Sequence, residues 1–144
     1  MNKTRFAPLL ILAVVALPAV GADTLPGPIF GQVLSVTDGD TVRVKAKVWL
    51  GLEIETLVRL EGIDTPELKG RCDDERRRAE AARAFLERLL PDGRLVLREV
   101  VWGKYAGRVV ARVETPKGED VATALIRAGH ARPYHGGHRQ PWCE

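Results

Sequence analysis

Alternating apolar and polar residues mark a pair of strands in the first half of the chain. In residues 41–48, valine and alanine alternate with arginine and lysine, as expected of a strand with one buried face. A second run at residues 56–63 follows a turn around Gly51. Together they predict an antiparallel hairpin, in which the first residues of one strand lie beside the last residues of the other.

The rest of the chain predicts further strands and two helices. The clearest helix is residues 73–90, because an apolar stripe with helical spacing follows an acidic first turn. Asp120 is placed to cap a second, shorter helix, and Gly129 to end it. In chain order we expect strands at 29–36, 41–48 and 56–63, a helix at 73–90, strands at 94–102 and 108–114, and a helix at 120–128.

This order of elements predicts the fold class. Three strands, a helix, two strands and a helix is the connectivity of a five-stranded OB-type barrel. We therefore expect an α+β fold that is mainly β. Residues 130–144 are rich in Gly, Pro, His and Arg and show no periodicity. Such barrels include many nucleic-acid binders, but a fold alone does not decide function.

The first 22 residues are typical of a secretory signal. Lys3 and Arg5 precede a short apolar run, and small residues ending at Ala22 offer a cleavage site. The run is shorter than the about 20 residues of a membrane-spanning helix. We expect a single domain at 23–144, located in the periplasm or secreted, with an uncleaved anchor as the alternative. A cleaved chain would have no stable membrane partner, and we expect a monomer.

Net charge gives little support for any class of partner. The full chain has 22 Lys and Arg against 19 Asp and Glu, and two of the basic residues would leave with the signal. A nearly neutral mature chain does not by itself indicate nucleic-acid binding, so only local clusters of charge can do so.

Cys72 and Cys143 are the only cysteines. In an exported chain such a pair is expected to form a disulfide rather than a metal site or a nucleophile. In the chain-entropy model this bridge would stabilise the fold by about 4 kcal/mol. It would also tie the C-terminus to the edge of the candidate site, which contains Asp40 and Asp64.

Two aspartates are expected to meet at one end of the hairpin. Asp40 precedes its first strand and Asp64 follows its second, and both share the parity of the buried apolar residues. Carboxylates about 4 Å apart repel by roughly 4 kcal/mol at an effective dielectric of 20, so such a pair shares a proton or binds a cation. Solvated turn aspartates are the alternative.

Arg59 precedes Asp64 on the second strand of the hairpin, and alternation predicts that its side chain points away from Asp64. A bulge at Gly62, or the length of the Arg59 side chain, would have to bring its guanidinium to the side of Asp64.

Three short motifs stand out along the chain. They are Asp-Gly-Asp-Thr-Val at 38–42, Arg59 followed by Asp-Thr-Pro-Glu at 64–67, and Lys104-Tyr105 leading to Arg108. Together they resemble the staphylococcal nuclease family, in the family's order and approximate spacing, and the match extends through Ala131. The resemblance implies a calcium-dependent phosphodiesterase on an OB barrel, which cuts DNA and RNA with little sequence preference and leaves 3′-phosphates.

The resemblance implies a role for each acidic position. Asp40 and Asp64 would bind calcium through their carboxylates and Thr65 through its backbone carbonyl, since a hard cation prefers oxygen ligands. Glu67 would be the general base that activates a water for in-line attack, while the metal polarises the phosphoryl oxygen.

The resemblance implies that basic and aromatic side chains bind the substrate. Arg59 and Arg108 would hold the phosphate and offset the negative charge of the transition state. Ala106 adds one residue to the family's Lys-Tyr-Gly-Arg turn, which leaves the reach of Arg108 open. Further substrate contacts would come from Lys104, Tyr105 and Tyr134.

Other readings stay open beside the calcium nuclease. A barrel that only binds nucleic acid or a protein would be expected to lack some of the two aspartates, the glutamate and the two arginines, and here all five positions are filled. An enzyme with another divalent ion, or with a preference for RNA or single strands, is a further alternative. Three histidines in the tail, His130, His135 and His138, match no zinc-site spacing. The tryptophans, Trp49, Trp102 and Trp142, are assigned to core or rim packing rather than base stacking.

Overall fold

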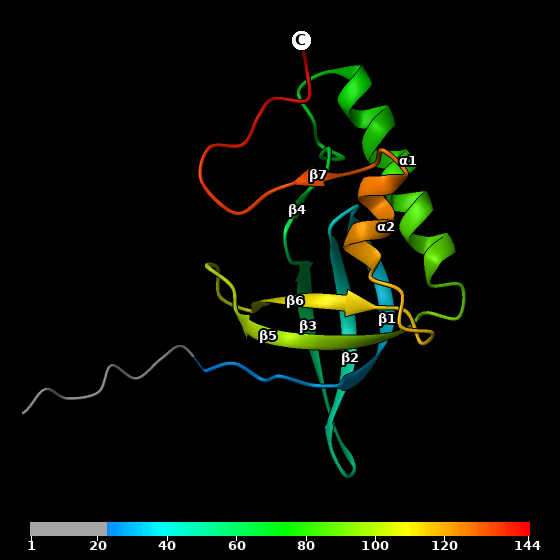
Figure 1. The fold of residues 1–144 in the computed structure, drawn as a ribbon, viewed down its shortest axis with the longest axis vertical. Coiled ribbons are helices and arrows are strands. Elements are labelled where there is room, and N and C mark those ends of the chain that lie inside the picture. The colour runs from blue at the N-terminus through cyan, green and yellow to red at the C-terminus, as the bar shows by residue number, and fades with distance from the viewer. Residues whose placement is uncertain (1–22) are drawn as a thin grey trace, which may run out of the picture.

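The computed structural model describes residues 23–144, and the expected signal lies outside them. Its main feature is a closed barrel of five strands in the order β1-β2-β3-β6-β5 (Figure 1). The α+β, mainly β, barrel prediction is confirmed. The barrel strands are β1 (Ile29–Asp38), β2 (Thr41–Trp49), β3 (Leu52–Leu60), β5 (Arg94–Trp102) and β6 (Arg108–Glu114); the helices are α1 (Asp73–Leu89) and α2 (Val121–Arg127); two short strands, β4 (Ile63–Asp64) and β7 (Arg132–Pro133), pair outside the barrel.

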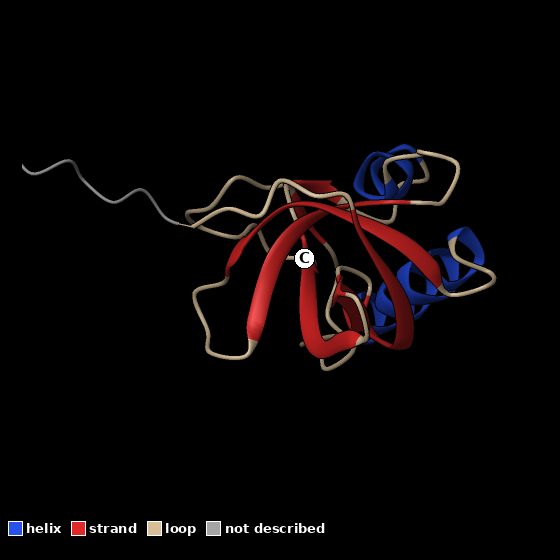
Figure 2. Ribbon diagram, turned by 90° about the horizontal axis from the view of Figure 1, so that it is seen from below, coloured by secondary structure: helices blue, strands red, loops and turns tan. Residues whose placement is uncertain are grey.

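The barrel strands pair mostly antiparallel, and the two helices pack against the barrel. Neighbouring barrel strands are antiparallel except β3 and β6, which run parallel over residues 57–60 of β3. Both helices lie on the same side of the barrel (Figure 2). As predicted, the side chain of Asp120 caps α2, by accepting a hydrogen bond from the Thr123 N–H at 2.7 Å. No helix in the described part of the chain is long and apolar enough to cross a membrane.

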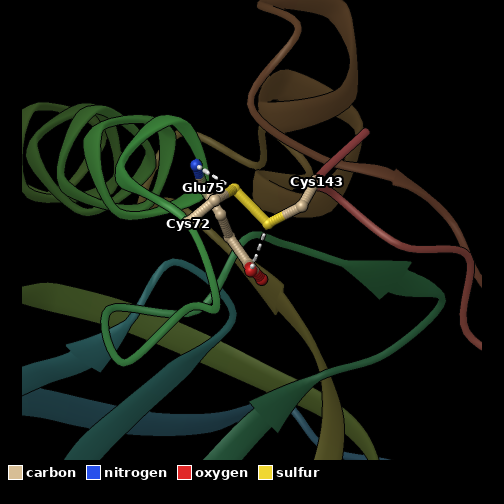
Figure 3. A group of neighbouring side chains, drawn as sticks. All are labelled: Cys72, Glu75 and Cys143. Atoms are coloured by element: carbon tan, nitrogen blue, oxygen red, sulfur yellow. Dashed lines mark hydrogen bonds between the residues drawn. A yellow bond between two sulfur atoms is a disulfide. The ribbon is translucent and has the colours of Figure 1, made fainter.

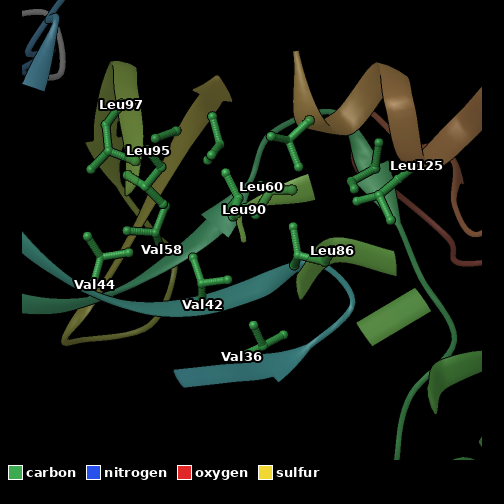
Figure 4. Packing of buried hydrophobic residues seen from close by; sticks show 14 of the residues in the cluster. Val36, Val42, Val44, Val58, Leu60, Leu86, Leu90, Leu95, Leu97 and Leu125 are labelled. Carbon is green, nitrogen blue, oxygen red and sulfur yellow. The ribbon is translucent and has the colours of Figure 1, made fainter. Parts of the chain in front are cut away.

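The barrel interior is filled by the apolar face of each strand. On β2, alternate residues Val42, Val44 and Ala46 are buried, which confirms the alternation seen in the sequence. Leu86 of α1 and Leu125 of α2 close the core from outside the barrel (Figure 4). Fully burying each leucine contributes about 1.5–3 kcal/mol.

The second hairpin strand differs from its predicted bounds. β3 spans Leu52–Leu60 rather than 56–63, and a turn at Gly62, whose φ is 77°, separates it from β4. This left-handed conformation suits glycine because it has no Cβ. The parity argument for Asp64 is therefore wrong, since the chain turns between β3 and Asp64. Asp64 is nevertheless only 1% exposed, and its strand β4 pairs with β7 of the tail, a segment without periodicity in the sequence.

The structure also places the tryptophans, for which the sequence suggested packing, and the histidines of the tail, for which a zinc site was considered. Trp49 and Trp102 end their strands and are 73% and 75% exposed, so neither packs in the core. The ring of His130 packs on Phe85, with 4.8 Å between centroids. Within residues 23–144, no cluster of three metal-ligating side chains contains a histidine, and the zinc alternative gains no support.

Gly39 lies where the β1–β2 turn meets α1 and the candidate site. A Cβ at this position would lie 2.8 Å from the Cβ of Ala82 and 3.2 Å from that of Thr65, both of which are buried. Gly39→Ala is therefore expected to lower the free energy of unfolding by about 1–3 kcal/mol, measured by denaturant titration. Adding Ala82→Gly should recover part of the loss, because it removes the nearest colliding atom. A single variant as stable as the wild type would contradict this close packing.

Candidate active site

Asp40 forms the first half of the site, in the turn between β1 and β2. It is buried, and its Oδ1 accepts a hydrogen bond from the Thr41 hydroxyl at 2.9 Å. Its Oδ2 accepts a hydrogen bond from Arg59 Nη1 at 2.7 Å. The other guanidinium nitrogen of Arg59, Nη2, donates to the carbonyl of Ile63 at 3.1 Å. The guanidinium of Arg59 thus joins Asp40 to the residue that precedes Asp64.

Asp64 forms the second half of the site, and donors from the C-terminal tail occupy both of its oxygens. Oδ1 accepts a hydrogen bond from Arg139 Nε at 2.6 Å. Oδ2 accepts from Arg132 Nε and Nη2 at 3.2 and 3.0 Å, and from the indole N–H of Trp142 at 3.1 Å. A buried ionised carboxylate is costly unless it is paired and hydrogen-bonded. These donors therefore make the burial of Asp64 tolerable.

Arg139 also reaches the next two candidate residues. Its Nη1 contacts Glu67 Oε1 at 2.6 Å, and its Nη2 lies 3.5 Å from the Thr65 carbonyl oxygen. Burial alone lowers the pKa of Arg139, but hydrogen bonds to Glu67 and Asp64 outweigh it and raise the pKa above its ordinary value. One permanent cation thus lies among three groups to which the family resemblance gave the binding of calcium and the activation of water.

Asp38 adds a further acid to this end of the barrel. Burial raises the pKa of Asp38, and the charges of Asp40 and Glu67 act in the same direction. A backbone hydrogen bond from Leu68 and the charge of Arg108 oppose this shift. The raised pKa follows first from burial, and the neighbouring carboxylates of Asp40 and Glu67 add to it, so Asp38 is a further acid close to the candidate site.

Arg108 starts β6 and is placed differently from Arg59. Its guanidinium lies over the ring of Tyr105, with 5.4 Å to the centroid. Among residues 23–144, its buried Nε is a polar side-chain atom without a hydrogen-bond partner. Its charge opposes the rise in the pKa of Asp38, so Arg108 lies within electrostatic reach of that carboxylate.

The other substrate-contact candidates lie in two separate segments. Lys104 and Tyr105 belong to the β5–β6 turn, where the Lys104 ammonium lies 6.0 Å from the ring centroid of an exposed Tyr105. Tyr134 lies in the tail, where its hydroxyl donates to the Gly137 carbonyl at 2.9 Å and its N–H donates to the Gly62 carbonyl at 2.8 Å.

Cys72 and Cys143 form the expected disulfide (Figure 3). Cys72 caps α1, and Cys143 Sγ lies 3.4 Å from Glu75 Oε2. Cys72, Glu75 and Cys143 are close enough to resemble a metal site. A disulfide sulfur is not a thiolate, and only the thiolate is a good metal ligand, so this cluster does not fit a metal.

Glu75 supports the loop that carries Glu67. It is buried at the start of α1, and its Oε1 and Oε2 accept hydrogen bonds from the N–H groups of Glu67 and Arg71 at 3.4 and 2.9 Å. Gly70 leaves room for this carboxylate, since a Cβ there would lie 2.5 Å from Glu75 Cγ. The buried acid therefore holds the backbone of Glu67 while leaving its side chain exposed.

Comparison with known proteins identifies the family of the chain. The family model described as staphylococcal nuclease homologue matches residues 57–141, more than half of the chain. The chain belongs to the staphylococcal nuclease family. No curated protein matches it. The matched range includes Arg59, Asp64, Glu67 and Arg108 but not Asp40, which the structure joins to the range through its ion pair with Arg59.

Three tail residues that contact the site of this staphylococcal nuclease homologue were missed in the sequence. Arg132 and Arg139 were given no role there, and Trp142 was assigned to packing. A tail without periodicity offers no pattern from which to place a side chain. The one available signal was Cys143, because a cysteine bridged to the edge of the site brings its neighbours with it.

Proposed function

We propose that the protein is a calcium-dependent nuclease that hydrolyses phosphodiester bonds in DNA and RNA with low sequence specificity and leaves 3′-phosphates. The observation that carries the proposal is the cluster of acids around Arg139 in a member of the staphylococcal nuclease family. A guanidinium that contacts Asp64, Glu67 and the Thr65 carbonyl marks a position where a cation is stable.

The donor set fits a hard divalent cation. The carboxylates of Asp40 and Asp64 and the carbonyl of Thr65 would hold calcium, and all three are oxygen donors. The family is generally metal-dependent, which supports the same assignment. When bound, the ion polarises the phosphoryl oxygen and neutralises part of the charge of the transition state.

Glu67 is the residue best placed to take a proton from an attacking water. Its side chain is 54% exposed, so water can reach the carboxylate, while Glu75 holds its backbone N–H. A carboxylate close to the cation position can orient a water and accept its proton during in-line attack.

The two arginines would stabilise the phosphate from different positions. Arg59 is held by Asp40 and the Ile63 carbonyl, and so presents a fixed positive charge. Arg108 lies over the ring of Tyr105 at the start of β6, and would donate to a phosphate oxygen through its guanidinium. Guanidinium groups suit this task because their planar donors match two oxygens at once.

The proposal includes export to the periplasm or the medium, with the first 22 residues as the signal. The disulfide supports it, because such bonds persist in oxidising compartments.

Digestion assays test the proposal directly. Purified protein is incubated with single- and double-stranded DNA and with RNA, in calcium, in magnesium and in chelator. We expect cleavage in calcium, none in chelator, and products whose 3′ ends carry phosphate. Asp40→Asn should raise the calcium concentration needed for half-maximal cleavage. A protein that binds nucleic acid but cuts nothing with any ion would instead be a binding module.

A further inference from the structure

The C-terminal tail lies on the candidate cation site rather than beside it. Arg139 contacts Asp64, Glu67 and the Thr65 carbonyl, and these contacts use the oxygen atoms that the proposed function gives to the ion and the water. We propose that the tail, residues 130–144, is a built-in competitor for the divalent cation, which must displace the guanidinium of Arg139 before it binds. This inference rests on the proposed function, because it concerns the regulation of the same site.

Competition follows from charge and from shared atoms. Arg139 Nε is 2.6 Å from Asp64 Oδ1, and its Nη1 is 2.6 Å from Glu67 Oε1. A divalent ion that takes Asp64 as a ligand would meet a second positive charge at contact distance. Like charges at this distance repel strongly in a partly buried site. The guanidinium and the ion therefore exclude each other.

The tail has its own anchors around Asp64. Arg132 binds Asp64 Oδ2 and also donates to the carbonyls of Gln140 and Pro141, the latter at 3.2 Å. The guanidinium of Arg132 lies over the ring of Trp142, 4.0 Å from the centroid. The tail thus folds on itself in the position that blocks the cation.

The disulfide makes the competition intramolecular. Cys143 lies four positions after Arg139 and is bonded to Cys72 at the start of α1 (Figure 3). At the other end of the tail, β7 pairs with β4. A loop closed at both ends holds Arg139 at a high effective concentration near Asp64. Opening the disulfide should weaken the competitor.

Two glycines lie in this loop, between the β4–β7 pairing and the disulfide that close it. Gly136 and Gly137 have φ of 95° and 88°, and a Cβ at either would have nothing within 4 Å. They lie between β7 and Arg139, in an exposed segment. A loop movement about these glycines would withdraw Arg139 with β7 and the disulfide intact.

Calcium binding to the oxidised, substrate-free protein tests the inference. Isothermal titration calorimetry compares the wild type with Arg139→Gln, which removes the charge but keeps a polar side chain. We expect Arg139→Gln to bind calcium about tenfold more tightly, within the usual range of coupling between two ligands. The matched control, Arg127→Gln at the exposed end of α2, loses the same charge and should bind as the wild type does. Equal or weaker affinity in Arg139→Gln would overturn the inference.

A second readout does not depend on that variant. Trp142 donates to Asp64, so calcium binding should change its fluorescence; replacing the exposed Trp49 and Trp102 by Phe isolates this signal. Changing both cysteines to Ser should also raise the affinity for calcium. An unchanged affinity would contradict the role of the disulfide in holding Arg139 close to Asp64.

Failure of the inference can be told apart from failure of the proposed function. If the wild type binds calcium and cuts nucleic acid while Arg139→Gln binds calcium no better, only the competition is wrong. If Arg139→Gln also cuts more slowly at saturating calcium, Arg139 acts on the substrate instead. If neither protein binds a divalent ion and neither cuts, both proposals fail.

Discussion

Glu67→Gln is expected to lower the rate of phosphodiester hydrolysis by about 10²–10⁴-fold. The amide has nearly the shape of the carboxylate but cannot accept the proton of the attacking water. Glu67 is exposed and its backbone is held by Glu75, so the substitution should leave the loop in place. The measurement is kcat on one defined oligonucleotide at saturating calcium.

Two controls separate proton transfer from folding. Glu61→Gln changes another exposed glutamate a few residues earlier in the chain and should keep the wild-type rate. The free energy of unfolding of Glu67→Gln should fall by less than about 1 kcal/mol, because its ion pair with Arg139 is exposed to solvent. A variant that keeps more than a third of the wild-type kcat would show that Glu67 is not the base.

Arg59→Ala and Arg108→Ala are each expected to lower kcat by about 10²–10³-fold, the usual cost of removing one donor to a developing charge. Their effects on stability should differ. Arg59→Ala leaves Asp40 buried without its ion pair, and should lower the free energy of unfolding by about 2–4 kcal/mol. Arg108→Ala removes a side chain with an unused buried donor, and should cost less than about 1 kcal/mol.

Denaturant titration and kinetics on both variants check this pair of expectations. Each serves as the control for the other, because both remove one arginine charge from the same end of the barrel. Equal losses of stability would contradict the different placements of the two guanidinium groups. Wild-type kcat in either variant would remove that arginine from the proposed mechanism.

Much of the fold could be predicted because its signals are local. The alternation in β2, the stripe of α1 and the cap at Asp120 each depend on residues a few positions apart, and all three are present in the structure. The disulfide was also predictable, since the chain has only two cysteines.

The site was predicted in part. The hairpin argument brought Asp40 and Asp64 to one end of the sheet, and the family resemblance added Glu67. The sequence also indicated that the Arg59 guanidinium would have to be brought to the side of Asp64. Alternation could not show the turn at Gly62, because that turn ends the strand on which the rule depends. Its physical effect is to put the Ile63 carbonyl within reach of Arg59.

The sequence alone determined the barrel class, the family resemblance and the candidate acids and arginines, because local spacing and residue chemistry carry that information. Only the tertiary structure decided which donors surround Asp64. Arg132, Arg139 and Trp142 lie more than 65 positions away along the chain, and they reach Asp64 through β-pairing and a disulfide that act over long sequence distances. No periodic pattern records such contacts.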